Sequence, residues 1–120
     1  MIYTPPIKKY KIRRTTEFRE QYKLLTSLHE KIDNKIKLVV ANPTLIGKPK
    51  RDNLRYTRGT HIAGNFVMLY MVLENDIIFL NVDRHDAAYR ETPRILGNIE
   101  REFPDLWIVM SPDLKRHLKR

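Results

Sequence analysis

The stretch from Phe66 to Val82 constrains the fold more than any other part of the chain. It consists of two uninterrupted apolar runs, FVMLYMVL and IIFLNV, joined by the polar turn Glu74-Asn75-Asp76. Apolar runs of this length, rich in Val, Ile, Phe and Tyr and bounded by turn residues, are typical of buried β-strands. We therefore predict a central β-hairpin whose ends bring distant polar residues onto one surface.

The chain carries a large excess of positive charge. It has 23 Lys and Arg residues against 14 Asp and Glu residues, which gives a net charge of +9. An excess of this size on a small domain points to a polyanionic partner, most simply nucleic acid. A solvated basic surface that serves only solubility fits the charge equally well.

Length and composition exclude several classes of protein. A chain of 120 residues has room for one domain with one core, so we predict a single domain over residues 1–120. The absence of cysteine excludes disulfides and thiolate metal sites. The longest apolar run is far shorter than the roughly 20 residues of a membrane span, and the basic N-terminus lacks the apolar segment of a signal peptide. We expect a cytoplasmic protein without membrane contact.

Apolar periodicity predicts a strand and two helices before the hairpin. We expect an extended lead-in over residues 1–6, an edge strand over 7–14, and helices over 16–26 and 28–41. Thr16 is the predicted N-cap of the first helix, and Ser27 with Glu30 forms a predicted capping box for the second. The second helix ends at Asn42-Pro43. The apolar faces of both helices are expected to cover one side of the sheet.

The predicted hairpin spans residues 60–82, and three further elements follow it. Thr92-Pro93 introduces a predicted helix over 94–102, and LWIVM at 106–110 is expected to be a short strand that closes an exposed sheet edge. Ser111-Pro112 has the pattern of an N-cap with proline at the first helical position, so it should open a last, basic helix.

A basic loop lies between the helix pair and the hairpin. Residues 43–59 contain five cations and Asp52 as their only acid. The cations are Lys48, Lys50, Arg51, Arg55 and Arg58. Such a segment is a candidate for contacts with RNA phosphates. An ordinary solvated surface loop accounts for the same composition.

Metal and cofactor chemistry has no motif in this sequence. The four histidines lie in four separate segments without ligand spacing, the glycines form no phosphate-binding loop, and neither serine sits in a nucleophile elbow. A metal-free and cofactor-free set of imidazole, guanidinium and phenol groups remains at the ends of the hairpin. The candidate catalytic residues are His61, Arg84, His85 and Tyr89. Such groups can cut RNA, because its 2′-hydroxyl supplies the nucleophile and histidine transfers protons at neutral pH. Taken singly, each histidine is as easily an ordinary surface residue.

The order of segments resembles a known family. A helix pair ending in Asn42-Pro43, a basic loop, GNFVMLYMV from Gly64, IIFLNV from Ile77 and RHDAAY from Arg84 together resemble the RelE/ParE superfamily of toxin–antitoxin toxins, nearest to the RelE-type branch. The resemblance covers residues 7–90. It implies an α+β fold in which a helical hairpin packs on a twisted, mostly antiparallel sheet, here with an additional C-terminal helix-strand-helix segment. RelE-type members are ribosome-dependent endoribonucleases that cut mRNA without metal and are neutralised by an antitoxin.

The resemblance assigns the family's site to particular positions. Its cationic loop falls on Lys48, Lys50 and Arg51, and the basic position before the central strand falls on Arg58 or His61. The family's Tyr-Arg pair falls on Phe66 and Val67, so a valine stands where the family has a phosphate-binding arginine. The family's His-Arg pair falls in reversed order on Arg84 and His85, and its final tyrosine falls on Tyr89.

Two functions from different classes fit this pattern. The first is a RelE-type endoribonuclease that cuts ribosome-bound mRNA and inhibits translation. The second is a non-catalytic protein, either ParE-like or inactive, that binds an antitoxin, a protein target or nucleic acid. Val67 favours the second, whereas the cluster from His85 to Tyr89 and the net charge favour the first. Beyond the resemblance, Lys115, Arg116, Lys119 and Arg120 either decorate a structural extension or add a contact with ribosomal RNA.

Overall fold

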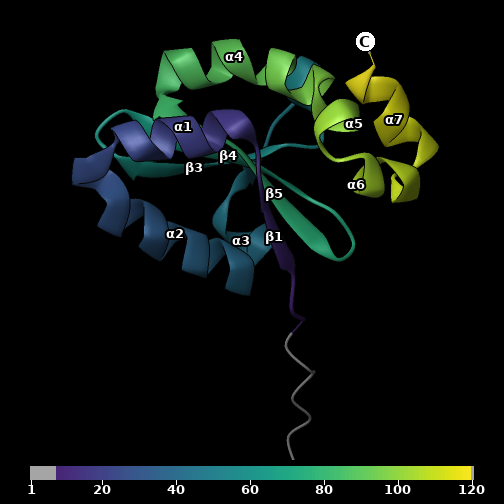
Figure 1. Ribbon diagram of the computed structural model, residues 1–120. Coiled ribbons are helices and arrows are strands. Elements are labelled where there is room, and N and C mark those ends of the chain that lie inside the picture. Colours follow the sequence, from purple (N-terminus) through teal and green to yellow (C-terminus); the bar gives the residue numbers. More distant parts are fainter. Residues whose placement is uncertain (1–7, 120) are drawn as a thin grey trace, which may run out of the picture.

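The two apolar runs form neighbouring antiparallel strands at the centre of a sheet, as the sequence predicts. The computed structural model describes residues 8–119 and shows a five-stranded sheet in the order β1-β5-β4-β3-β2 (Figure 1). Among the described strands, only β1, which runs beside β5, pairs in parallel. The strands are β1 Lys11–Arg14, β2 Lys48–Pro49, β3 Arg58–Ala63, β4 Phe66–Val72 and β5 Asp76–Arg84. The predicted edge strand is thus confirmed over 11–14, and the predicted lead-in over 1–6 lies outside the described residues.

The helix pair before the basic loop covers one face of the sheet, which confirms the prediction. This layer consists of α1 Thr16–Leu24, the 3-10 turn η1 Thr26–Leu28 and α2 His29–Ala41. The short helix α3 Pro43–Ile46 follows at the start of residues 43–59, where the sequence predicted a loop. Phe18, Ile32 and Val39 are buried against Met68 and Phe79 of the sheet. Burial of large apolar side chains such as these is the main force that holds a helix on a sheet.

The ends of these helices differ from the prediction in two details. The N-cap of α1 is Thr15 rather than Thr16: its hydroxyl accepts the amide of Phe18 at 3.0 Å and donates to the carbonyl of Leu80 at 2.7 Å. Thr15 therefore caps the helix and ties it to β5 at once. The predicted capping box of Ser27 is wrong, because Ser27 lies inside η1 and α2 begins after Leu28 without a side-chain cap.

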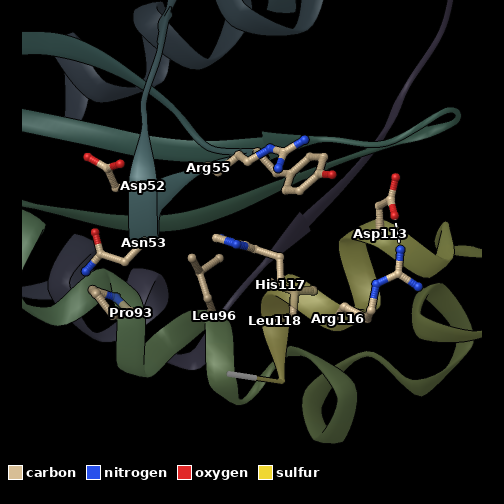
Figure 2. Close-up of a pocket in the computed structure, with 10 residues that line it drawn as sticks. Asp52, Asn53, Arg55, Pro93, Leu96, Asp113, Arg116, His117 and Leu118 are labelled. Atoms are coloured by element: carbon tan, nitrogen blue, oxygen red, sulfur yellow. Dashed lines mark hydrogen bonds and ion pairs between the residues drawn. The ribbon is translucent and has the colours of Figure 1, made fainter.

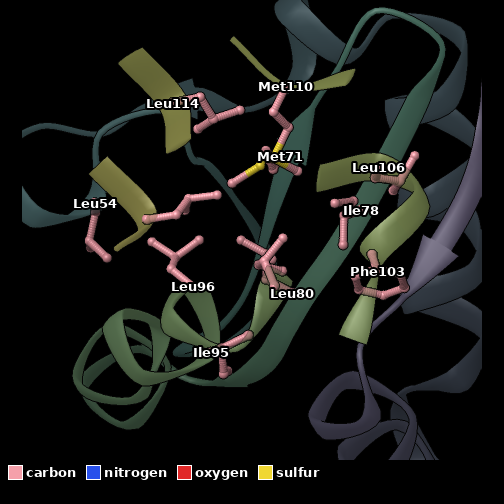
Figure 3. Packing of buried hydrophobic residues seen from close by; sticks show 12 residues of the cluster. Leu54, Met71, Ile78, Leu80, Ile95, Leu96, Phe103, Leu106, Met110 and Leu114 are labelled. Atoms are coloured by element: carbon pink, nitrogen blue, oxygen red, sulfur yellow. The ribbon is translucent and has the colours of Figure 1, made fainter. Parts of the chain in front are cut away.

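The other face of the sheet is covered by four helices from the C-terminal part of the chain (Figure 1). They are α4 His85–Gly97, α5 Ile99–Glu102, α6 Pro104–Val109 and α7 Pro112–Leu118. Their apolar side chains pack on Met71, Ile78 and Leu80, as Figure 3 shows. Ser111 caps α7 by accepting the amide of Leu114 at 3.2 Å, which confirms the predicted cap.

Two predictions for the C-terminal segment are wrong. The helix expected over 94–102 already begins at His85, directly after β5, and is interrupted at Asn98. The strand expected over 106–110 is the helix α6. Leu106 and Met110 point into the core whereas Ile108 and Val109 are 74% and 76% exposed, so the buried positions recur at helical rather than strand spacing. The segment therefore covers a face of the sheet and closes no edge.

A β-bulge in β5 places the residues that hold α4 on the sheet. Leu69 pairs with Asn81 and Tyr70 with Phe79, so Leu80 is an extra residue in β5. With the extra residue, Leu80 joins the core beneath the C-terminal helices and Asn81 also faces this side. The side-chain amide of Asn81 donates to the carbonyl of Ala88 at 3.1 Å, which fixes the first turns of α4 on the sheet.

Candidate functional site

Three of the predicted catalytic residues gather around the turn between β3 and β4. The Nε2 atom of His61 donates to the carbonyl of Gly64 at 2.6 Å. The backbone amide of His85 donates to the next carbonyl, that of Asn65, at 2.7 Å. Gly64 has φ +54°, a left-handed conformation that favours glycine and lets the turn present both carbonyls. Arg84 directly precedes His85 and forms the start of α4.

A second group assembles on the first two turns of α4. We call it the α4 cluster, and it consists of Lys50, His85, Asp86 and Tyr89. The Nδ1 atom of His85 lies 3.3 Å from a carboxylate oxygen of Asp86, and the rings of His85 and Tyr89 pack with centroids 4.5 Å apart. Lys50 completes the cluster from the basic loop, with Nζ 5.1 Å from the Tyr89 ring centroid. The cluster therefore combines an imidazole, a phenol and an ammonium group, and the His85 side chain is 58% exposed.

Gly59 of β3 makes room for this arrangement. A Cβ atom at Gly59 would lie 2.8 Å from the side chain of Lys50 and 3.2 Å from the hydroxyl of Tyr89. The absence of a side chain on Gly59 thus allows the ammonium and the phenol to approach the sheet together. No other residue type fits here without displacing Lys50.

The Arg84 side chain points away from the α4 cluster, although its backbone directly precedes His85. Its guanidinium lies 5.8 Å from the ring centroid of Phe66, and Phe66 packs with the apolar cluster on the α1–α2 side. His61 pairs with Val67, which packs on Ala88 of α4, so His61 lies on the α4 side. The structure thus brings His61, His85 and Tyr89 to one face and turns Arg84 toward the other.

The position that the resemblance assigns to a phosphate-binding arginine is buried. Val67 is 9% exposed and packs with Leu69 and Ala88 beneath α4, next to Tyr89. A charged side chain here would be expensive to bury without a partner. The first turns of α4 therefore seal the centre of this face, and the accessible polar groups lie along its rim.

The five cations of the basic loop divide into separate roles. Lys48, Arg51 and Arg55 are exposed, and Lys50 belongs to the α4 cluster. Arg58 instead turns inward and donates to the carbonyls of Thr44, at 2.6 Å, and Gly47. Arg58 is thus engaged in holding α3 against β3.

Tyr70, which the apolar pattern predicts as a core residue, anchors the start of the basic loop. It is fully buried, its hydroxyl donates to the carbonyl of Pro43 at 2.6 Å, and the amide of Gly47 donates to that hydroxyl at 2.9 Å. Burial raises the pKa of the Tyr70 phenol, because the charged form would lose its hydration. Gly47 is required here, since a Cβ would lie 2.8 Å from the Tyr70 ring.

A groove that sequence reasoning missed lies against the later turns of α4 (Figure 2). It has a volume of about 890 Å³ and runs between the 3-10 turn η2, Asp52–Leu54, and the helices α4 and α7. Its walls include Arg55, Tyr56, Arg116 and His117. Arg55 and Tyr56 precede Arg116 and His117 by about sixty positions, and the two pairs share no motif. No sequence signal therefore predicts that they meet.

Within residues 8–119 the structure has neither a group of side chains suited to hold a metal ion nor a helix suited to cross a membrane. No three His, Asp or Glu side chains in this part of the chain are grouped as ligands for a metal ion. No helix among the described residues is long and apolar enough to cross a membrane.

Comparison with known proteins gives matches in structure but none in sequence. No family model matches the chain, and no curated protein is detectably similar to it in sequence. Among solved structures, the DinJ–YafQ toxin–antitoxin complex of E. coli matches with a TM-score of 0.59 at 16% identity, over 68% of this chain and 98% of that chain. The toxin–antitoxin complex RelBE2 of Mycobacterium tuberculosis matches with a TM-score of 0.57 at 24% identity, over 66% and 94%. The YoeB–YefM complex of Staphylococcus aureus gives 0.56 at 22%, over 64% and 98%.

These matches establish a shared fold. Nearly the whole length of each matched chain is covered, whereas about a third of the present chain lies outside each match. The architecture that the resemblance implied, a helical hairpin on a mostly antiparallel sheet, is therefore confirmed, and this chain carries additional structure.

Proposed function

We propose, from its RelE-type fold, that this protein is the toxin of a toxin–antitoxin pair and that it cuts ribosome-bound mRNA in the cytoplasm. The observation that carries the proposal is the structural match, which spans almost the whole of several toxins that were solved in complex with antitoxins. The net charge of +9 agrees with a polyanionic substrate. An antitoxin is accordingly the expected protein partner.

In this proposal His85 takes the proton from the attacking 2′-hydroxyl of the RNA. Asp86 accepts from Nδ1 of His85 and so leaves Nε2 as the proton acceptor. The imidazole is exposed enough for a phosphodiester to reach it, and general base catalysis requires this direct approach. The reaction needs no metal ion or cofactor, because the nucleophile belongs to the substrate.

The remaining groups of the site stabilise charge and orient the substrate. Lys50 supplies an ammonium beside Tyr89, where negative charge on the phosphate would grow. Tyr89 offers a ring for a base or a hydroxyl for the phosphate. His61, on the same side of the sheet, is the candidate acid for the leaving 5′-oxygen. Lys48, Arg51 and Arg55 would follow the backbone of the RNA along the rim.

A second function is favoured by Val67. In the resemblance this position holds a phosphate-binding arginine, and here it is packed beneath α4. A toxin of this build could act without cutting RNA, by binding a protein target as ParE-type toxins do. The basic surface would then serve recognition alone.

Induced expression followed by mapping of mRNA ends on translating ribosomes separates the two functions. We expect growth arrest with new 5′ ends within open reading frames, and loss of both for His85→Gln. Lys37→Gln, an exposed substitution on α2, is the control and should leave both unchanged. Arg84→Gln should weaken cleavage less than His85→Gln, because Arg84 stacks on Phe66 away from the α4 cluster.

Two outcomes would contradict the nuclease. Growth arrest that survives both His85→Gln and Lys50→Gln, without new mRNA ends, would support the ParE-like alternative. Expression without any effect on growth, in cells that lack the short acidic protein expected to be encoded beside it, would argue against a toxin altogether.

A further inference from the structure

The groove between η2, α4 and α7 is lined by planar side chains. The guanidinium of Arg55 lies 4.9 Å from the ring centroid of Tyr56, and the rings of Tyr56 and His117 meet edge to face with centroids 5.5 Å apart. In Figure 2, His117 extends from α7 into the groove. Aromatic rings and guanidinium planes are the groups on which proteins stack unpaired bases.

The charges of the groove argue for recognition rather than simple attraction. Arg55 and Arg116 are balanced by Asp52 and Asp113, and Arg116 forms an ion pair with Asp113. A surface that only attracts phosphates would hold cations without acids. Together with Asn53, these residues instead provide both donors and acceptors beside the planar groups, which is what the edge of a base requires.

The size and position of the groove fit one nucleotide of an RNA strand. Its volume of about 890 Å³ lies within the range of small-molecule sites. Pro93 and Leu96 form its floor on α4, the helix that also carries His85 and Tyr89. Leu96 lies seven positions after Tyr89 in this helix, which corresponds to a rise of about 10 Å. A strand held at the α4 cluster would therefore enter the groove a short distance further along the same helix.

We propose that this groove binds one unpaired nucleotide of a single-stranded RNA, with its base against Tyr56, His117 and the guanidinium of Arg55. Asp52 and Asn53 contact the edge of the base, and Arg116 exchanges Asp113 for the phosphate. This binding site is separate from the α4 cluster and does not depend on cleavage there. It gives the helix α7 a role in substrate recognition.

Fluorescence anisotropy with a labelled single-stranded RNA of about ten nucleotides tests the proposal. The measurement uses the full chain with His85→Gln, so that cleavage cannot interfere, over a series of salt concentrations. We expect Tyr56→Leu to weaken binding by roughly 5- to 150-fold, the effect of losing one stacked base. The salt dependence should stay unchanged, because no phosphate contact is removed. Tyr56→Phe should retain most of the affinity.

Tyr10→Leu is the matched control. Tyr10 is partly exposed and carries its own stacked cation, with Lys8 Nζ 5.0 Å from its ring centroid, but it precedes β1, outside the groove. Equal affinities for Tyr56→Leu and Tyr10→Leu would overturn the proposal. So would a loss in Tyr56→Leu that is accompanied by a flatter salt dependence, which would indicate electrostatic contact alone.

A second measurement keeps the proposal testable if Tyr56→Leu does not fold. The NMR ring signals of Tyr56 and His117 in the otherwise intact protein should shift on addition of adenosine or uridine monophosphate. Shifts confined to Tyr89 and His85 would assign nucleotide binding to the α4 cluster only and would refute the groove. A shift of the Tyr56 ring signal on addition of an antitoxin, without any shift on addition of nucleotide, would assign the groove to protein binding. That outcome would also refute the proposed nucleotide site.

Discussion

Replacement of Tyr70 by phenylalanine should cost much of the stability of this domain, although it removes only one oxygen atom. The Tyr70 hydroxyl is fully buried and serves two backbone groups, the carbonyl of Pro43 and the amide of Gly47. The Tyr70→Phe variant leaves both groups without this partner in the buried interior. Each buried and unsatisfied group costs about 1–3 kcal/mol. We expect the free energy of unfolding to fall by about 2–4 kcal/mol.

Urea unfolding followed by circular dichroism measures this loss, and the slope of the transition should not change. For a chain of this size the expected loss corresponds to a decrease in Tm of about 8–16 °C. The matched control is Tyr22→Phe. The Tyr22 hydroxyl donates to Asp33 at 2.8 Å on the surface, where water replaces the lost bond, so less than about 1 kcal/mol should be lost.

The same substitution should loosen the basic loop. The Gly47 amide lies directly before Lys48, so its hydrogen exchange should become markedly faster in Tyr70→Phe and remain slow in Tyr22→Phe. Equal losses of stability in the two variants would refute the reasoning, because the two hydroxyls would then be energetically alike. Unchanged exchange at Gly47 would refute the anchoring of the loop.

Three further predictions concern close packing and pH. Gly47→Ala should destabilise the protein by about 1–3 kcal/mol, because the added Cβ would collide with Tyr70. Gly97→Ala, at the open end of α4, should be neutral or stabilising by about 0.5–1 kcal/mol. Thermal unfolding compares the two variants, and equal effects would contradict the close approach of Gly47 to Tyr70. Because the pKa of Tyr70 is raised on folding, the stability that depends on its protonated form is complete below about pH 10 and is lost as the pH rises through the folded value. Urea titrations should show that the free energy of unfolding falls less at alkaline pH in Tyr70→Phe than in the unmodified protein. An equal fall in both would argue against a role of the Tyr70 phenol. The hydrogen bond from Arg13 lowers the pKa of Asp105. This pair therefore stabilises the protein at pH values above the ordinary aspartate pKa, and the stabilisation is lost as the pH falls through the lowered pKa. Arg13→Gln should make the free energy of unfolding less dependent on acidic pH, and an identical acid profile would contradict a contribution from this pair.

The fold could be predicted from the sequence where one element buries its side chains on its immediate neighbours. Two apolar runs flanking Glu74-Asn75-Asp76 leave a chain few alternatives to a buried hairpin. The helices α1 and α2 likewise show their buried stripe directly. The prediction of a strand for LWIVM was wrong, because five consecutive apolar residues fit a strand or a helix equally well. Only the surrounding packing shows that Ile108 and Val109 face solvent.

The candidate site could be predicted only in part, for a related reason. The sequence indicated that His85 and Tyr89 stand together at the exit of β5, and one helical turn accounts for that. The approach of Lys50 depends on the space above Gly59, which no local pattern reveals. The inward turn of Arg58 depends on carbonyls of α3 that become available only when that helix packs beside β3.

The sequence alone determined the central hairpin and the helix pair on one face of the sheet, because apolar periodicity and turn residues act over a few positions and need no distant partner. Only the tertiary structure decided which polar groups share a surface. The bulge at Leu80, the docking of α4 through Asn81 and the packing of α7 beside Tyr56 each depend on contacts between residues far apart in the chain. Such contacts are set by the shape of the packed core, and individual residue types do not encode that shape.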